Sequence, residues 1–498
     1  MASPNSVSGT AATMTILATG LGSSITSADP VILSANISAV RDGLALSAGT
    51  ASLVASMATL ALAAGVLGAG ALGDKYGMRR MYSLGLLGTM VFGVAATLAP
   101  NAAVLLVARA GIGLAFALQL GLALAIVNVV FPPERRSAAI SLHLGAGFAV
   151  AVPMPAIGSL LVEHIGWRSA FLVAPVLALI ALVMVRRYVP ETPRGERRLD
   201  VTGLLLVAVA LLAIVFGLSR LQSGLDAGVV GVLAVGLVAA VAFVIVERRT
   251  PSPALDLRLF RSGPFDAAVA AGMAFNFLSG GVTVLLAFYL VAVRGEAPTL
   301  LGLLMAPAAL LSAAAAAAAG RAAVRLGQRA VLIGGLVLLV AGLLVITRLA
   351  ENSSLWLLFA AVACNAVGAA VVETVEATIM LQTAPVELSG AVAAVKSAVG
   401  QAAYSMGPAV FALIGTSVFV HSAGIDTDQA RDALRVAQGH NVLDPQRARA
   451  VVDGVHASMI EAIHTLGWTL TVVPVVAIVV VVATLVRPVR TPGAAHVR

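Results

Sequence analysis

The sequence contains few charged residues and a single cysteine. Only 11% of its 498 residues are charged, against about a quarter in soluble domains, and 60% are hydrophobic. This composition argues strongly against a water-soluble fold. The lone Cys364 excludes an intrachain disulfide, and no cluster of metal-ligating residues accompanies it. We therefore expect neither a metal site nor a cofactor.

Lysine is also scarce, since Lys75 and Lys396 are the only two. The net charge of +8 comes from arginines, which are scattered over short connections between apolar runs. They form no continuous basic face, which argues against nucleic acid as a partner. No nucleotide-binding loop or nucleophile arrangement occurs in a connection long enough to hold an active site, so we do not expect an enzyme.

Apolar runs are abundant, and many are long enough to cross a hydrocarbon core of roughly 30 Å. They predict an all-α membrane protein with 14 transmembrane helices. The expected spans are 12–40, 48–72, 82–99, 102–130, 138–163, 169–187, 201–220, 227–246, 265–293, 298–320, 330–349, 355–383, 389–417 and 464–486.

Basic residues gather on one side of this arrangement, which the positive-inside rule identifies as cytoplasmic. Both termini then lie in the cytoplasm, and Trp167, Trp356 and Trp468 lie at the outer interface, which suits their amphipathic rings. The Ala-, Val- and Gly-rich composition indicates a bacterial protein, so we expect a multi-pass protein of the bacterial plasma membrane. The lipid bilayer is its expected partner, and we expect a monomer.

Three regions follow from the spacing of the spans. We expect a six-helix bundle over residues 1–188, an accessory two-helix insertion with cytoplasmic connections over 189–262, and a second six-helix bundle over 263–498, with an extracellular segment at about 418–463. The bundles look duplicated, because Gly70, Gly77 and Arg79 recur with the same spacing as Gly320, Gly327 and Arg329. Repeated halves with a site at their interface are common in secondary transporters.

The sharpest motif is Gly-Ala-Leu-Gly-Asp-Lys-Tyr-Gly-Met-Arg-Arg at 70–80, in the short connection after the second span. Its glycines permit a tight turn and close helix approach. Asp74 can lie against a neighbouring helix N-terminus or pair with an arginine. The motif resembles the loop between helices two and three of the major facilitator superfamily. The resemblance implies a cytoplasmic gate formed by Gly70, Asp74, Lys75, Gly77, Arg79 and Arg80.

Two further stretches resemble one subgroup of this superfamily. Residues 199–203 (Leu-Asp-Val-Thr-Gly) and 253–260 (Pro-Ala-Leu-Asp-Leu-Arg-Leu-Phe) are similar to the fourteen-helix drug:proton antiporters, which include exporters of quaternary ammonium compounds. The resemblance implies a fold of two six-helix bundles plus two accessory helices. Pro153, Pro155 and Gly158 match part of the antiporter motif in the fifth span, although Met154 and Ser159 replace two of its glycines.

An acid in the first span and an arginine in the fourth are candidate coupling residues. Asp29 lies near the expected midplane, where an ionisable group costs at least about 2.5 kcal/mol and indicates function. Arg109 matches the family arginine near the proton site. Pairing with Arg109 would favour the charged carboxylate, whereas removal from water would favour the protonated acid. A static ion pair that fixes two helices is the alternative.

The last six spans hold a second candidate. Glu373 and Glu376 are one helical turn apart and share a face. Lys396, in the next antiparallel span, lies at the depth of Glu376. We expect a Glu376–Lys396 ion pair with Glu373 left free to carry a proton or bind a cation; a purely structural network is the alternative. His143 could relay protons, but a packed histidine is the better interpretation. Other side chains that could line a cavity are Gln119, Phe275, Asn276, Phe277, Tyr289 and Asn365.

Together these features predict proton-coupled export of amphipathic, cationic drugs or toxic compounds, with the proton gradient as energy source. Two alternatives stay open. One is a dedicated exporter of a specific metabolite or lipid. The other is a membrane sensor or scaffold that binds a ligand without moving it, although a scaffold could replace its buried charges with apolar residues at a gain in stability.

Overall fold

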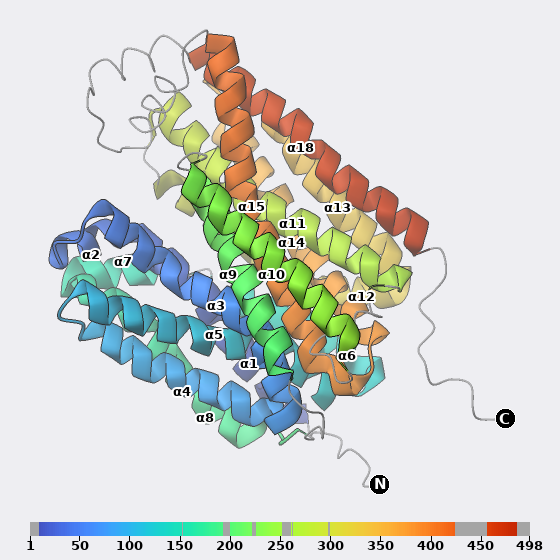
Figure 1. Cartoon of the computed structure of the whole chain (residues 1–498). Helices are drawn as coiled ribbons and strands as arrows, with labels where there is room; N and C mark the ends of the chain where they lie inside the picture. Colours follow the sequence, from blue (N-terminus) through green and yellow to red (C-terminus); the bar gives the residue numbers. More distant parts are fainter. Residues whose placement is uncertain are drawn as a thin grey trace.

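The computed structural model describes residues 9–151, 153–192, 200–221, 226–250, 260, 262–296, 299–423 and 456–485, and every regular element in these ranges is a helix (Figure 1). The first group comprises α1 (Gly9–Ala35), α2 (Ile37–Gly43), α3 (Ala48–Tyr76), α4 (Met78–Thr97), α5 (Ala102–Val130), α6 (Pro133–Ala151), α7 (Met154–Ile165), the 3-10 helix η1 (Trp167–Phe171) and α8 (Val173–Tyr188).

The helical hairpin α9 (Val201–Leu221) and α10 (Ala227–Arg249) follows. The last group comprises α11 (Gly263–Phe288), the π-helical turn η3 (Tyr289–Val293), α12 (Thr299–Leu326), α13 (Gln328–Ile346), α14 (Leu355–Thr383), the short η4 (Val386–Leu388), α15 (Ser389–Ala423) and α18 (His456–Thr484). Three stretches lie outside the described residues. Residues 424–455 form most of the predicted extracellular segment, and residues 193–199 and 253–259 carry parts of the antiporter resemblance.

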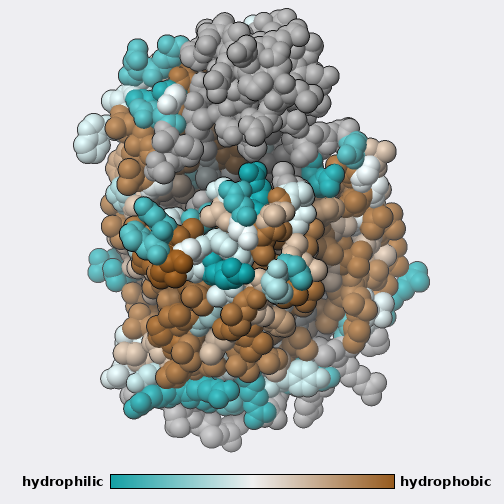
Figure 2. Space-filling model, turned by 90° about the vertical axis from the view of Figure 1, so that its left-hand side faces the viewer, coloured by the Kyte–Doolittle hydropathy of each residue, from teal (hydrophilic) through white to brown (hydrophobic). Residues whose placement is uncertain are grey.

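Among the described residues, 12 stretches are long and apolar enough to cross a membrane, so the predicted count of 14 is not confirmed. The two long helices outside this set are α4 and α15. α4 begins with Arg79 and Arg80, which lower the hydropathy of a helix of only 20 residues. The surface agrees with a membrane protein: Figure 2 shows a broad hydrophobic band with hydrophilic residues gathered along its lower edge.

The first six long helices pack on one another around the α3–α5 crossing, where small residues bring the backbones together. Gly113 of α5 lies against the Ala58 carbonyl, and Gly121 lies 3.1 Å, measured from an ideal Cβ, from the Val66 carbonyl. The last six helices form a second bundle in which α11, α14 and α15 contact one another. We call these groups the first and the second half.

Two helices that we predicted as continuous are interrupted. The predicted span 12–40 breaks at Asn36, whose side-chain amide donates to the Ile32 carbonyl and ends α1. The predicted span 138–163 breaks before Pro153, between α6 and α7. Proline cannot donate a backbone hydrogen bond and prevents the helix from continuing unbroken.

The halves meet through α3 with α15, α5 with α15, and α6 with α12. The close contacts involve the last turns of α3 and the first turns of α15, so the halves touch at the end where α3 finishes. The α9–α10 hairpin lies in front of this meeting line in Figure 1, and α9 contacts both α3 and α15. Leu211 of α9 packs against a small cluster of Val66, Ala69, Ala117 and Ala398, which joins both halves.

Candidate functional site

Asp29 and Arg109 form a closed ion pair inside the first half. The Arg109 guanidinium Nη1 lies 2.6 Å from Asp29 Oδ2, and the two side chains are 0% and 4% exposed. Arg109 Nε also donates to the Val54 carbonyl of α3 at 3.4 Å. The predicted proximity of Asp29 and Arg109 is therefore present, and it joins α1, α3 and α5.

Asp29 faces the interior of its own half. Ser27 and Val31, two residues before and after it on α1, are exposed, and successive residues of a helix turn by about 100°. Asp29 therefore lies on the opposite side of α1, beside an apolar crevice that α1 forms with η1 and α8. Its lining includes Ile25, Ala28, Ile32, Ala170 and Val173. The carboxylate is sealed from the exposed face of α1 in this conformation.

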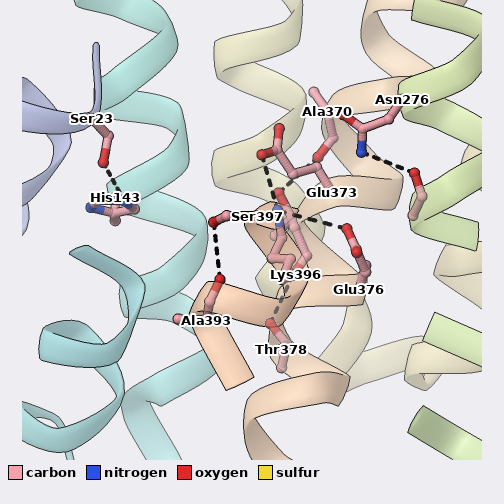
Figure 3. Close-up of polar contacts among 12 residues, drawn as sticks. Ser23, His143, Asn276, Ala370, Glu373, Glu376, Thr378, Ala393, Lys396 and Ser397 are labelled. Atoms are coloured by element: carbon pink, nitrogen blue, oxygen red, sulfur yellow. Dashed lines mark hydrogen bonds and ion pairs between the residues drawn. The ribbon is translucent and has the colours of Figure 1, made fainter. Parts of the chain in front are cut away.

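The second half contains three ionisable side chains in contact (Figure 3). Lys396 Nζ on α15 lies 3.3 Å from Glu373 Oε1 and 3.7 Å from Glu376 Oε2, both on α14. We predicted that Lys396 would pair with Glu376 and leave Glu373 free. This was wrong in part, because Lys396 contacts both acids and only the Glu373 contact is a hydrogen bond. Its long side chain lies between the two carboxylates, which equal helical depth alone does not reveal.

The two acids differ in environment. Glu373 is 24% exposed, whereas Glu376 is 4% exposed. Glu376 fits against Gly272 of α11, where any Cβ would overlap its Oε1. Asn276 closes the same turn of α11 by donating to the Gly272 carbonyl. Gly272 gives no signal in the sequence, since its contribution is the absence of a side chain.

His143 of α6 lies across from this cluster, within electrostatic range of Lys396 (Figure 3). It is 1% exposed, and its ring nitrogens contact Thr19 at 2.9 Å and Ser23 at 3.4 Å, both on α1. The Thr19 hydroxyl donates to the Thr15 carbonyl, so it accepts from Nδ1–H of the ring. His143 is thus a packed histidine that ties α6 to α1.

Asp74 connects the two halves. Its two carboxylate oxygens accept hydrogen bonds from the Gly390 and Ala391 backbone N–H groups, each at 3.1 Å, at the start of α15. A negative charge is stabilising at a helix N-terminus, and this is one of the two placements expected for Asp74. Gly70 and Gly390 make the contact possible, because a Cβ on either would overlap the facing backbone or Asp74. Asn128 adds a 2.8 Å hydrogen bond to the Ser389 hydroxyl nearby.

The basic residues of the motif bind within the first half instead. Arg79 and Arg80 lie 3.9 and 3.6 Å from the Glu191 carboxylate, and Arg79 also donates to the Arg186 carbonyl. Lys75 lies over the Tyr76 ring. Gly77 has φ +99°, a left-handed conformation that favours glycine and makes the sharp turn into α4.

The remaining predicted residues lie away from the cluster. Pro153 precedes α7 and Pro155 is its second residue, while Gly158 packs tightly on Ile32 of α1. Gln119 donates to Thr89, Tyr289 to the Ala350 carbonyl, and Phe277 stacks with Phe411. Phe275 is buried and Asn365 is half-buried in α14. No group of three or more His, Cys, Asp or Glu residues in the described ranges could hold a metal ion.

Several named bacterial proteins are similar to this chain in sequence. The tetracenomycin C resistance and export protein of Streptomyces glaucescens is 31% identical over 300 residues, which are 59% of this chain and 55% of that protein. The multidrug efflux pump LfrA of Mycolicibacterium smegmatis is 29% identical over 396 residues, 78% of this chain and 76% of the pump. The chain spans little more than half the length of the first of these relatives.

Solved structures share the arrangement of helices. The human organic anion transporter MFSD10 (TETRAN) superposes with a TM-score of 0.61 at 16% identity, covering 95% of this chain and 98% of that one. The family model described as Major Facilitator Superfamily matches residues 11–408. This multi-span membrane protein therefore belongs to the Major Facilitator Superfamily, a family of transporters.

Proposed function

We propose that this protein is a proton-coupled exporter of amphipathic, cationic compounds. The observation that carries the proposal is the Glu373–Lys396–Glu376 cluster, with two acids and one base at a buried position facing α6. An excess acid in a membrane interior is costly unless it carries a proton or meets a cation. The names of the relatives, which include multidrug efflux and antibiotic export, support the same class of substrate.

The proposed topology has 14 spans, with α4 and α15 as the two that complete the set. It keeps the three regions 1–188, 189–262 and 263–498. Thr15 of α1 lies 3.3 Å from the Tyr188 carbonyl at the end of α8, and Arg329 donates to the Val482 carbonyl near the end of α18. These contacts support placing both termini at the arginine-rich end, which we assign to the cytoplasm of a bacterial plasma membrane.

In the proposed cycle, the contacts of Asp74 with α15 close the cytoplasmic end and break when the halves rock. Proton exchange takes place at the cluster in the second half. Asp29 and Arg109 have a supporting part, since they hold α1 against α5 while the halves move. The substrate reaches the cluster from the space between the halves, and no cofactor takes part.

Inside-out vesicles containing the protein test this proposal. They are loaded with a pH-sensitive dye, given an acid interior, and then supplied with ethidium. We expect protons to leave when the cation is added, because each cation carried inward is exchanged for protons. The matched control is Glu373→Gln, which should abolish the signal; a wild-type signal in this variant would remove the cluster from the proposal.

A dedicated exporter is the second candidate. It is favoured by relatives named for resistance to a single antibiotic, such as tetracenomycin C. No proton movement across a panel of lipophilic cations, with folded protein confirmed, would select this candidate over multidrug export.

A further inference from the structure

The charge balance of the cluster in the second half allows one exchangeable proton. Lys396 can neutralise one carboxylate, so with all three groups ionised the cluster carries one excess negative charge. Buried charges are paired or neutralised. A proton on one of the two acids balances the charge of the cluster when no other cation is present.

The geometry distinguishes the two acids. Glu373 is closer to Lys396, accepts its hydrogen bond and is partly exposed. Glu376 is enclosed, and its Oε2 has no hydrogen-bond partner among the described residues. Its charged neighbours are Lys396 and Glu373, with His143 of α6 beyond the lysine, whereas α11 faces it with Gly272 and the neutral Asn276.

We propose, building on the proposed function, that Glu376 in the gap left by Gly272 holds the exchanged proton, that Glu373 binds the cationic substrate, and that Lys396 couples them. A cation that binds Glu373 displaces Lys396. The ammonium then moves to Glu376, whose O–H bond breaks and whose proton passes to water. When the cation leaves, Lys396 returns to Glu373 and Glu376 takes up a proton. Gly272 is a positioning residue, since it keeps the Glu376 carboxyl within reach of Lys396.

Proton release on ligand binding tests the assignment directly. Tetraphenylphosphonium is added to purified protein in weakly buffered detergent with a pH indicator, and binding is measured in parallel by equilibrium dialysis. We expect wild type to bind the cation and release protons. Glu376→Gln should bind but release none, and Glu373→Gln should bind far more weakly. Release from Glu376→Gln equal to wild type would overturn the proposal.

Gly272→Ala tests the positioning role. The added methyl group displaces only the end of a side chain, so the fold is retained, but the carboxyl moves away from α11. A misplacement of about 1 Å can reduce the rate of such a step by up to roughly a hundredfold, and the pH profile of exchange should shift. In the double variant Gly272→Ala/Glu376→Asp, the acid is shorter by about 1.5 Å and leaves room for the added methyl group. The double variant should recover much of the exchange.

The matched control is Gly334→Ala in α13, where a Cβ meets nothing within 4 Å. It should exchange like wild type. If wild type neither binds nor exchanges the cation, the proposed function fails. If wild type exchanges but Gly272→Ala exchanges normally, or the double variant is no better than Gly272→Ala alone, the positioning role fails and the proposed function stands.

Discussion

The buried ion pair of the first half and the cluster of the second half differ in charge count and exposure. Asp29 and Arg109 are balanced one to one and sealed. Lys396 faces two acids, of which Glu373 is 24% exposed. Arginine stays charged in proteins, whereas carboxyl groups can take up a proton. The charges of the pair therefore balance, whereas the cluster has one acid more than its lysine can neutralise.

This difference is the basis for proposing that the pair is structural and that the cluster exchanges protons. Burial and pairing are common to both, so neither identifies function alone. What the cluster has in addition is an excess acid and a partly exposed carboxylate, that of Glu373. The variants below test whether stability depends on the pair and exchange on the cluster.

The largest expected effect is that of Asp29→Asn on stability. It leaves the Arg109 guanidinium buried without a counter-charge, which should lower the free energy of unfolding by about 3–5 kcal/mol. Thermal unfolding in detergent measures the loss. Arg109→Met should cost less, because Asp29 can be neutralised by a proton, and the double variant should recover most of the stability. A stable Asp29→Asn protein that has lost exchange would instead assign coupling to Asp29, as the sequence alone predicts.

Glu373→Gln should show the opposite pattern. Lys396 keeps Glu376 as a partner, so the melting temperature should stay close to that of wild type. Exchange of ethidium for protons should fall by at least about tenfold, which corresponds to roughly 1.4 kcal/mol. The vesicle assay and a thermal melt on the same preparation measure both quantities. A large loss of stability with normal exchange per folded molecule would make the cluster structural.

Asp74→Ala should weaken the contact between the halves. It removes a helix-terminal acceptor worth about 1 kcal/mol, so the population open at this end should rise. Spin labels are attached at Arg80→Cys and Arg325→Cys in a Cys364→Ala background. The distance between them, measured by double electron–electron resonance, reports the separation of the halves. Asp42→Ala, at an exposed residue outside these contacts, is the control. An unchanged distance distribution would show that the glycine contacts suffice.

The smallest effect is expected for Ser23→Ala. Its hydrogen bond to His143 is long, at 3.4 Å, and a typical hydrogen bond contributes only about 0.5–1.5 kcal/mol. Stability should change by less than that, and exchange should stay normal. Impaired exchange with normal folding would extend the exchanging site into the first half and make His143 part of it.

Much of the fold followed from the sequence because hydrophobic length and polar breaks are local signals. For Asp74 the motif allowed two partners, a helix N-terminus or an arginine, and only the structure shows that the N-terminus of α15 is the one in contact. The breaks at Asn36 and Pro153 were missed, because the apolar composition continues across both. Arg79 and Arg80 explain why α4 is not among the 12 spans, since charges near the start of a short helix lower its hydropathy.

The sequence predicts which charged residues form the candidate site, but not how their side chains contact one another. Counting residues along helices places Glu376 and Lys396 at equal depth, but it gives neither the rotation of each helix nor the path of a long side chain. Gly272 and the Asn128–Ser389 contact join segments far apart in the chain. Only the packed structure brings such segments together.

The scarcity of lysine has a consequence for chemical labelling. An amine-reactive reagent has two side-chain targets in the entire sequence, Lys75 and Lys396. Lys75 is half-buried on the last turn of α3, whereas Lys396 is 10% exposed between two carboxylates. Acylation requires a neutral amine that the reagent can reach. The extent of modification at Lys396, read by mass spectrometry against Lys75 in the same molecule, therefore reports when this ammonium loses its partners, without any engineered residue.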